Sequence, residues 1–211
     1  MRDRMPYDAQ TAQQLQTRVC NDYVTRFAGR LRQACRRNTN LLRYGRDLHT
    51  RRTKPRRPMK LYFLRHGKAD WPDWDRPDDE RPLNEQGRRE MERIAQFLRE
   101  VEIEVSSILS SPLPRAWQTA EYAAEALGVK LAQEPTVGKG FSAAKLRSLL
   151  ERENGRDLMI VGHEPDFTTV IAALTGGDVK LGKGGLARVD VGPGALHGRL
   201  IWLIPPKIAR M

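Results

Sequence analysis

The sequence predicts an α/β fold, a three-layer sandwich in which a largely parallel sheet has helices on both faces and follows a basic N-terminal extension. Two patterns lead to this prediction. From residue 59 onward, short apolar runs alternate with longer stretches in which apolar residues recur every three or four positions. Strands and helices that alternate in this way build a mainly parallel sheet covered on both sides. The distribution of charge, in turn, separates residues 1–58 from the rest.

The whole net charge of +11 belongs to residues 1–58. This segment has 15 Lys and Arg against 4 Asp and no Glu, whereas residues 59–211 have 22 basic and 22 acidic residues. Apolar residues at every fourth position from Leu15 to Cys35 give a weak amphipathic helical pattern. We expect a partly helical or disordered extension before a folded domain at residues 59–211. The extension either binds nucleic acid or an anionic surface, or is dispensable, with Met59 as the natural start.

The sequence favours a cytoplasmic protein. Both cysteines, Cys20 and Cys35, lie in the extension, so the expected domain has neither a disulfide framework nor thiolate ligands for a metal. No apolar run approaches the roughly 18 residues that cross a bilayer, and we expect no transmembrane segment.

The first half of the domain is expected to contain two strands and two helices. The apolar run Leu61–Leu64 predicts the first strand, and residues 106–110 predict the second. Between them a helix begins at Asn84. Its apolar face consists of Met91, Ile94, Ala95, Leu98 and Val101. After the second strand, Ser111 is expected to cap a helix whose first position is Pro112 and whose end is Gly128.

The second half is expected to add four strands and two helices. The strands are predicted at residues 129–132, 157–162, 186–191 and 200–204, and the helices at residues 143–150 and 165–175. The strand at residues 157–162 is apolar throughout its centre, as in a strand buried on both faces. The last two strands alternate in polarity around Gly192-Pro193-Gly194, which predicts a hairpin.

Histidines and arginines stand where these elements end or begin. His66 follows the first strand in the tripeptide Arg65-His66-Gly67, His163 follows a later buried strand, and Arg115 lies in the first turn of a helix. Parallel strands bring their carboxyl ends to one edge of the sheet, where open α/β folds bind ligands. Planar guanidinium groups hold phosphoryl oxygens in pairs. We therefore expect a phosphate site at this edge, to which Arg81 contributes unless it pairs with a nearby aspartate.

His66 is the candidate nucleophile. Neighbouring positive charge lowers the pKa of an imidazole, and a neutral imidazole nitrogen can attack phosphorus. The expected intermediate is a phosphohistidine that water hydrolyses. His163 would donate hydrogen bonds to the phosphoryl oxygens as the transition state forms.

Four blocks of sequence resemble the histidine phosphatase (phosphoglycerate-mutase-like) superfamily and, within it, the SixA-type phosphohistidine phosphatase branch. They are residues 64–71, 80–87, 110–121 and 161–165, and residues 200–207 are similar too. The resemblance covers residues 59 to about 207. It implies that His66 is phosphorylated, that His163 is the second catalytic histidine, and that no metal or organic cofactor takes part. It also implies that Arg65, Arg81 and Arg115 bind phosphate.

Two positions depart from the pattern of the family. The usual phosphatases and mutases carry a glutamate as proton donor in a longer insertion after the third strand. Here that region is short and holds only Glu134, either the general acid or an exposed residue beside Pro135. Glu164 follows His163 and either repels anionic substrates or caps the helix at Pro165.

A site with only a weak general acid favours one class of substrate. A phosphoramidate leaves as an imidazole with a pKa of about 6.5, which needs less help from an acid than an alkoxide does. Protein phosphohistidine is therefore the expected substrate. The alternatives are a small-molecule phosphomonoesterase of the same superfamily, and a non-catalytic domain whose arm, residues 1–58, binds a polyanion.

Overall fold

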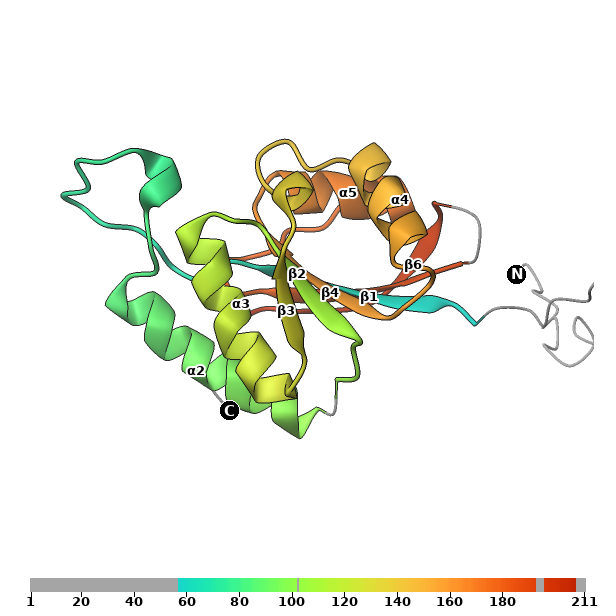
Figure 1. Ribbon diagram of the computed structural model, residues 1–211, viewed down its shortest axis with the longest axis horizontal. Helices are drawn as coiled ribbons and strands as arrows, with labels where there is room; N and C mark the ends of the chain where they lie inside the picture. Colours follow the sequence, from blue (N-terminus) through green and yellow to red (C-terminus); the bar gives the residue numbers. More distant parts are fainter. Residues whose placement is uncertain (1–56, 102, 193–195, 208–211) are drawn as a thin grey trace, which may run out of the picture. The chain divides into compact units, whose positions relative to one another are not determined.

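The computed structural model describes residues 57–101, 103–192 and 196–207. Within these ranges, six strands form one sheet and four α-helices cover it (Figure 1). None of the helices described is long and apolar enough to cross a membrane. The helical pattern expected from Leu15 to Cys35 lies outside the described residues, as do residues 193–195 of the hairpin turn.

The sheet is mixed and has the strand order β3-β2-β4-β1-β5-β6. The strands are β1 (Met59–Arg65), β2 (Ser107–Ser110), β3 (Lys130–Gln133), β4 (Leu158–Gly162), β5 (Leu186–Val191) and β6 (Gly198–Ile204). The first four in the order pair in parallel, whereas β5 pairs antiparallel with both β1 and β6. The predicted largely parallel sheet and its terminal hairpin are confirmed. This order makes β1 and β4 direct neighbours.

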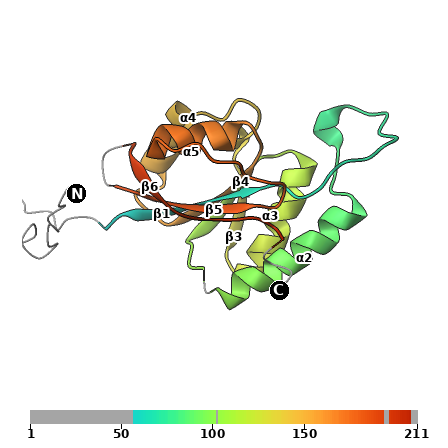
Figure 2. The same ribbon diagram turned by 180° about the vertical axis from the view of Figure 1, so that it is seen from behind.

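Helices lie on both faces of the sheet, so the predicted three-layer arrangement is also confirmed (Figures 1 and 2). The helices are α2 (Glu85–Glu100), α3 (Pro114–Leu127), α4 (Ala143–Arg152) and α5 (Asp166–Thr175). Because strand side chains point alternately to opposite faces, neighbours in β1 enter different cores. Phe63 packs with Phe167 of α5, and Leu64 packs in the cluster that contains Met91 of α2.

The segment between β1 and α2 projects beyond the end of the sheet (Figure 1). Contacts close to both of its ends hold it. The backbone N–H of Asn84 donates to the carbonyl of Lys68 at 3.0 Å, and the Asn84 side chain accepts from Gly87 N at 2.7 Å, which caps α2 at the helix start expected there. A Cβ atom on Gly87 would lie 2.1 Å from the Lys68 carbonyl oxygen, so only glycine permits this approach. A short 3-10 helix, η2 (Asp78–Glu80), lies within the segment.

The start of α3 differs from the prediction. Pro114 rather than Pro112 begins the helix, with Leu113 as its N-cap, and Ser111 lies further back. The sequence Ser111-Pro112-Leu113-Pro114 contains two prolines, and each is compatible with a first helical position. Sequence alone favoured the wrong one because serine is the better cap. The predicted end of the helix is confirmed, since Gly128 adopts a left-handed conformation with φ 63°.

Candidate active site

The two histidines predicted to act together lie side by side. Their ring centroids are 5.1 Å apart, and both are buried, with 8% of His66 and 7% of His163 exposed. The parallel pairing of β1 with β4 explains this, because Arg65 is in register with Gly162 and each histidine is the next residue. The backbone N–H of His66 also donates to the carbonyl of Gly162 at 3.0 Å.

The protonation state of His66 follows from its surroundings. Burial, reinforced by the charges of His163, Arg115 and Arg65, lowers the pKa of His66 to about 3, although the hydrogen bond to Gly67 opposes this shift. The ring is therefore neutral at physiological pH. Its Nδ1 atom lies 2.7 Å from the carbonyl oxygen of Gly67, which can only accept, so Nδ1 carries the proton. The Nε2 atom keeps its lone pair, as a nucleophile requires.

His163 is oriented by Ser111. Its Nε2 atom lies 2.8 Å from the Ser111 hydroxyl oxygen, which also accepts from the backbone N–H of Leu113 at 3.3 Å. The hydroxyl proton has no other acceptor among the described residues, so we assign it to His163 Nε2 and the imidazole proton to Nδ1. Burial first, and then the charges of Arg115 and Arg65, lower the pKa of His163 to about 4, while Asp78 and Asp79 oppose the shift.

Arg115 and Arg81 converge on one aspartate. Arg115, only 6% exposed, donates from Nη1 to the Asp78 carbonyl at 2.7 Å and from Nη2 to its carboxylate at 3.1 Å. Arg81 Nη2 pairs with the other carboxylate oxygen at 2.5 Å. The pairing of Arg81 with a nearby aspartate, which sequence analysis left open, thus occurs in the structure. Arg65 donates from Nη1 to the carbonyl of Leu181 at 2.8 Å.

Three buried nitrogens around the histidines have no hydrogen-bond partner among the described residues. They are Arg65 Nε, Arg81 Nε and His163 Nδ1. Buried donors without partners are costly, by roughly 1–3 kcal/mol each, and are therefore rare in folded proteins. Two guanidinium donors and an imidazole donor suit an oxyanion with several acceptor atoms. The site therefore has the chemistry of a phosphate-binding site.

Sequence analysis missed the contribution of Thr119. Its hydroxyl donates to the carbonyl of Arg115 at 2.7 Å and accepts from the backbone N–H of Gly67 at 3.0 Å. Thr119 thereby joins the turn after β1, which carries His66, to the helix that carries Arg115. The signal was the position of Thr119, one helical turn after Arg115 and on the same face.

The carboxylate of Glu134, the possible general acid, is paired on both oxygens. One carboxylate oxygen accepts from Thr136 N at 3.1 Å and Oγ1 at 2.6 Å, and the other pairs with Arg152 at 2.7 Å. Burial alone would raise the pKa of Glu134, but these contacts outweigh it and lower the pKa. The carboxylate is thus ionised and occupied, with no proton to donate near neutral pH. Glu164, one residue before the N-cap Pro165, accepts from the N–H and hydroxyl of Thr168 in the first turn of α5.

Comparisons with known proteins agree with this geometry. The model of the histidine phosphatase superfamily (branch 1) matches residues 61–137. An uncharacterized protein from Picosynechococcus sp. strain PCC 7002 is 35% identical over 165 residues, which cover 71% of this chain and 98% of that protein.

Solved structures extend the likeness to the whole described domain. A proposed phosphohistidine phosphatase, SixA from Agrobacterium tumefaciens, shares 28% identity with a TM-score of 0.62, over 71% of this chain and 99% of that one. The protein histidine phosphatase SixA in complex with tungstate has 24% identity and a TM-score of 0.64, with the same coverage. A mycobacterial glucosyl-3-phosphoglycerate phosphatase has the same fold, with 18% identity, a TM-score of 0.56, and coverage of 70% and 99%.

Proposed function

Because the chain belongs to the histidine phosphatase superfamily and is of the SixA type, we propose that it is a phosphatase whose intermediate is a phosphohistidine at His66. One observation carries the proposal. The neutral His66 keeps the lone pair on Nε2, its ring lies 5.1 Å from that of His163, whose Nδ1 is buried without a partner among the described residues, and the charges of Arg65 and Arg115 act on both rings. A nucleophile and oxyanion donors are thereby combined in one site.

In the first step, Nε2 of His66 attacks phosphorus and forms the P–N bond while the bond to the leaving group breaks. The imidazole gains positive charge, which the Gly67 carbonyl stabilises through the proton on Nδ1. Arg65, Arg81, Arg115 and His163 Nδ1 hold the phosphoryl oxygens, on which negative charge is spread in the transition state. In the second step, water attacks phosphorus, the P–N bond breaks, and His66 recovers its lone pair.

The leaving group decides between the candidate substrates. Because Glu134 is occupied by Thr136 and Arg152, it does not supply the proton that the leaving group needs. An imidazole leaving group accepts a proton near neutral pH, and an alkoxide depends far more on an acid. This difference supports protein phosphohistidine as the substrate, ahead of a small phosphate ester.

The test compares both classes under identical conditions. Phosphate release is measured from a phosphohistidine-bearing protein and from a panel of small phosphate esters, with the His66→Ala variant as the blank. We expect kcat/KM to be at least tenfold higher for the phosphohistidine protein. Faster hydrolysis of the esters would replace the proposed substrate, and no hydrolysis of either would refute the phosphatase.

We also propose that the phosphatase domain begins near Arg57 and that the basic residues before it form a separate arm. Arg57 donates to both carboxylate oxygens of Asp157, at 2.9 and 3.0 Å. Contacts with the domain therefore begin two residues before Met59. The charge of the arm supports binding to nucleic acid or to an anionic surface. The cytoplasmic location stays a prediction from the sequence.

A further inference from the structure

We infer that Asp78 is an intramolecular competitor of phosphate, whose carboxylate pairs with Arg81 and Arg115 and so weakens the binding of product phosphate and speeds its release. The inference rests on the proposed function, because it takes these two arginines as ligands of the phosphoryl oxygens. It adds a residue that the sequence patterns did not single out for the reaction.

The geometry of Asp78 is that of a bound oxyanion. Its two carboxylate oxygens point to different arginines, Oδ1 to Arg81 Nη2 at 2.5 Å and Oδ2 to Arg115 Nη2 at 3.1 Å. A phosphoryl group would use its oxygens in the same way, since carboxylate and phosphate both match the guanidinium fork. A phosphoryl group that engages these Nη2 atoms must therefore replace the carboxylate.

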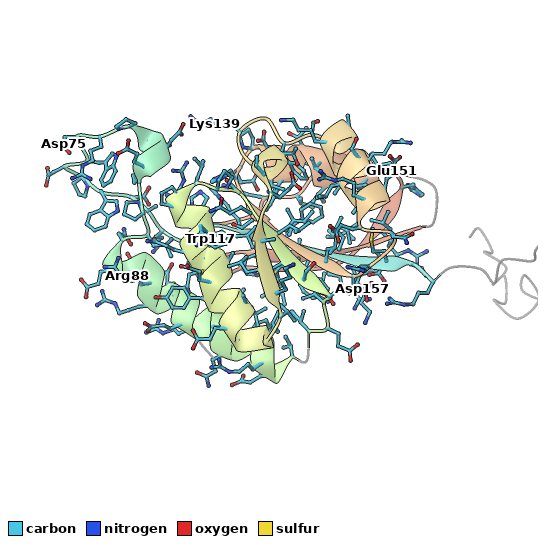
Figure 3. All side chains as sticks on the ribbon, in the orientation of Figure 1. Asp75, Arg88, Trp117, Lys139, Glu151 and Asp157 are labelled. Atoms are coloured by element: carbon cyan, nitrogen blue, oxygen red, sulfur yellow. The ribbon has the colours of Figure 1, made fainter. Side chains whose placement is uncertain are left out.

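The Asp78 side chain can move out of the site more easily than the Arg115 side chain that it contacts. The side chain of Asp78 is 54% exposed, whereas that of Arg115 is 8% exposed. The backbone nearby is fixed from two sides, because Arg115 Nη1 holds the Asp78 carbonyl and Lys139 Nζ lies 2.6 Å from the carboxylate of Asp79. Figure 3 shows Lys139 in the loop before α4 and Asp75 at the far end of the projecting segment. Rotation of the Asp78 side chain is then enough to free the Nη2 atoms of both arginines, while Arg115 Nη1 keeps its contact with the Asp78 carbonyl.

A competitor of this kind has a use in a phosphatase. Buried guanidinium groups and imidazole donors bind a phosphate dianion tightly, and tight binding would leave the site filled with product. A carboxylate on the same chain acts at a high effective concentration and lowers the affinity for every anion that must displace it. A substrate that makes further contacts outside the phosphoryl group compensates for this loss, but free phosphate does not.

The alternative is that Asp78 only orients the arginines, and it predicts an effect of the opposite sign. Asp78→Asn removes the charge but keeps the backbone carbonyl that Arg115 contacts. Asp75→Asn is the matched control, because Asp75 is exposed in the same segment and neutralising it makes the same change in net charge. Asp78→Ser serves as a second neutral variant, and thermal unfolding verifies that each variant is folded.

The experiment measures the Kd of inorganic phosphate by calorimetry and its Ki as a product inhibitor, for the full chain and the three variants. We expect both constants to fall about tenfold in Asp78→Asn and Asp78→Ser, and to stay within twofold in Asp75→Asn. Weaker or unchanged phosphate binding in both Asp78 variants would overturn the inference while leaving the proposed function intact. If neither the wild type nor any variant binds phosphate at millimolar concentration, the phosphate site itself is wrong, and the inference falls with it.

Discussion

The Nε2 atom of His163 lies 2.8 Å from the hydroxyl oxygen of Ser111. Ser111 directly follows β2, the strand that pairs with β4. Ser111 is fully buried, and its oxygen already accepts a hydrogen bond from Leu113 N. Its proton has no acceptor among the described residues other than His163 Nε2, which assigns the ring proton to Nδ1, the buried nitrogen without a partner there. Ser111 thus acts on the reaction through His163, as a positioning residue.

Replacement of Ser111 by alanine should lower kcat without raising KM to the same extent. Without the hydroxyl, both tautomers of His163 become accessible, and one of them offers a lone pair instead of a donor to the phosphoryl oxygens. We expect kcat to fall roughly tenfold, about 1.4 kcal/mol in the barrier. Imidazole 15N chemical shifts report the tautomer directly. An unchanged His163 tautomer in the variant would show that Ser111 does not fix the proton.

The convergence of His66 and His163 was predictable because it depends on backbone topology. Both residues follow apolar runs, and parallel pairing of such runs puts the residues after them at one edge of the sheet. The helix start at Asn84 and the stop at Gly128 were predictable for a similar reason, since they depend on local backbone geometry.

The contacts that set the chemistry were not predictable in the same way. Asp78 meets Arg115 across 37 residues, and Glu134 meets Arg152 across 18. Such pairs depend on how loops fold over the sheet edge, and hydrophobic periodicity carries no information about that. The sequence therefore indicated which residues gather at the edge of the sheet but left open which side chains form ion pairs and hydrogen bonds with one another. Glu134 is an example, because its position in the sequence does not reveal its pairing with Thr136 and Arg152.

Replacement of His66 by alanine should abolish hydrolysis and leave the fold intact. The ring is buried at the edge of the sheet but belongs to neither hydrophobic core cluster, so its loss leaves the core in place. We expect kcat/KM to fall by at least about 10³, or roughly 4 kcal/mol. His197→Ala is the control, since His197 is an exposed histidine. Mass spectrometry of the wild type without acid treatment should find the transient phosphate on His66, and activity of the variant within tenfold of wild type would refute the nucleophile.

The stability of the protein should decrease as the pH falls from about 6.5 to 5. Both site histidines have folded-state pKa values, about 3 and about 4, that lie below the ordinary value of 6.5. The unfolded chain therefore binds more protons in this window, and protons favour unfolding. Each histidine contributes at most about 1.4 kcal/mol per pH unit. Urea unfolding at several pH values should show a smaller slope for His66→Gln, and equal slopes would show that the folded-state pKa is ordinary.

Replacement of Glu134 by glutamine should change activity by less than about threefold. The carboxylate is bound to Thr136 and Arg152 and has no proton to give. We expect instead a loss of about 1 kcal/mol in the free energy of unfolding, because a charged hydrogen-bond acceptor is replaced by a neutral one. Steady-state kinetics on a phosphohistidine protein and on one small ester separate the two roles. A large fall in kcat with the ester alone would restore Glu134 as the general acid for esters.

Removal of residues 1–56 should abolish polyanion binding and leave phosphatase activity unchanged. Every candidate catalytic residue lies after Arg57, and residues 59–211 carry no net charge. With the arm present, the affinity for a polyanion should fall steeply as salt rises, because each neutralised phosphate releases a counterion.

Removal of two further residues, Arg57 and Pro58, eliminates the ion pair of Arg57 with the buried Asp157. Since Arg57 is largely exposed, and Lys60 N still donates to Asp157, we expect that second cut to cost only about 1 kcal/mol. Thermal unfolding and phosphate release from residues 57–211 and 59–211 test both points, and inactivation of the longer fragment would show that the arm is part of the catalytic domain.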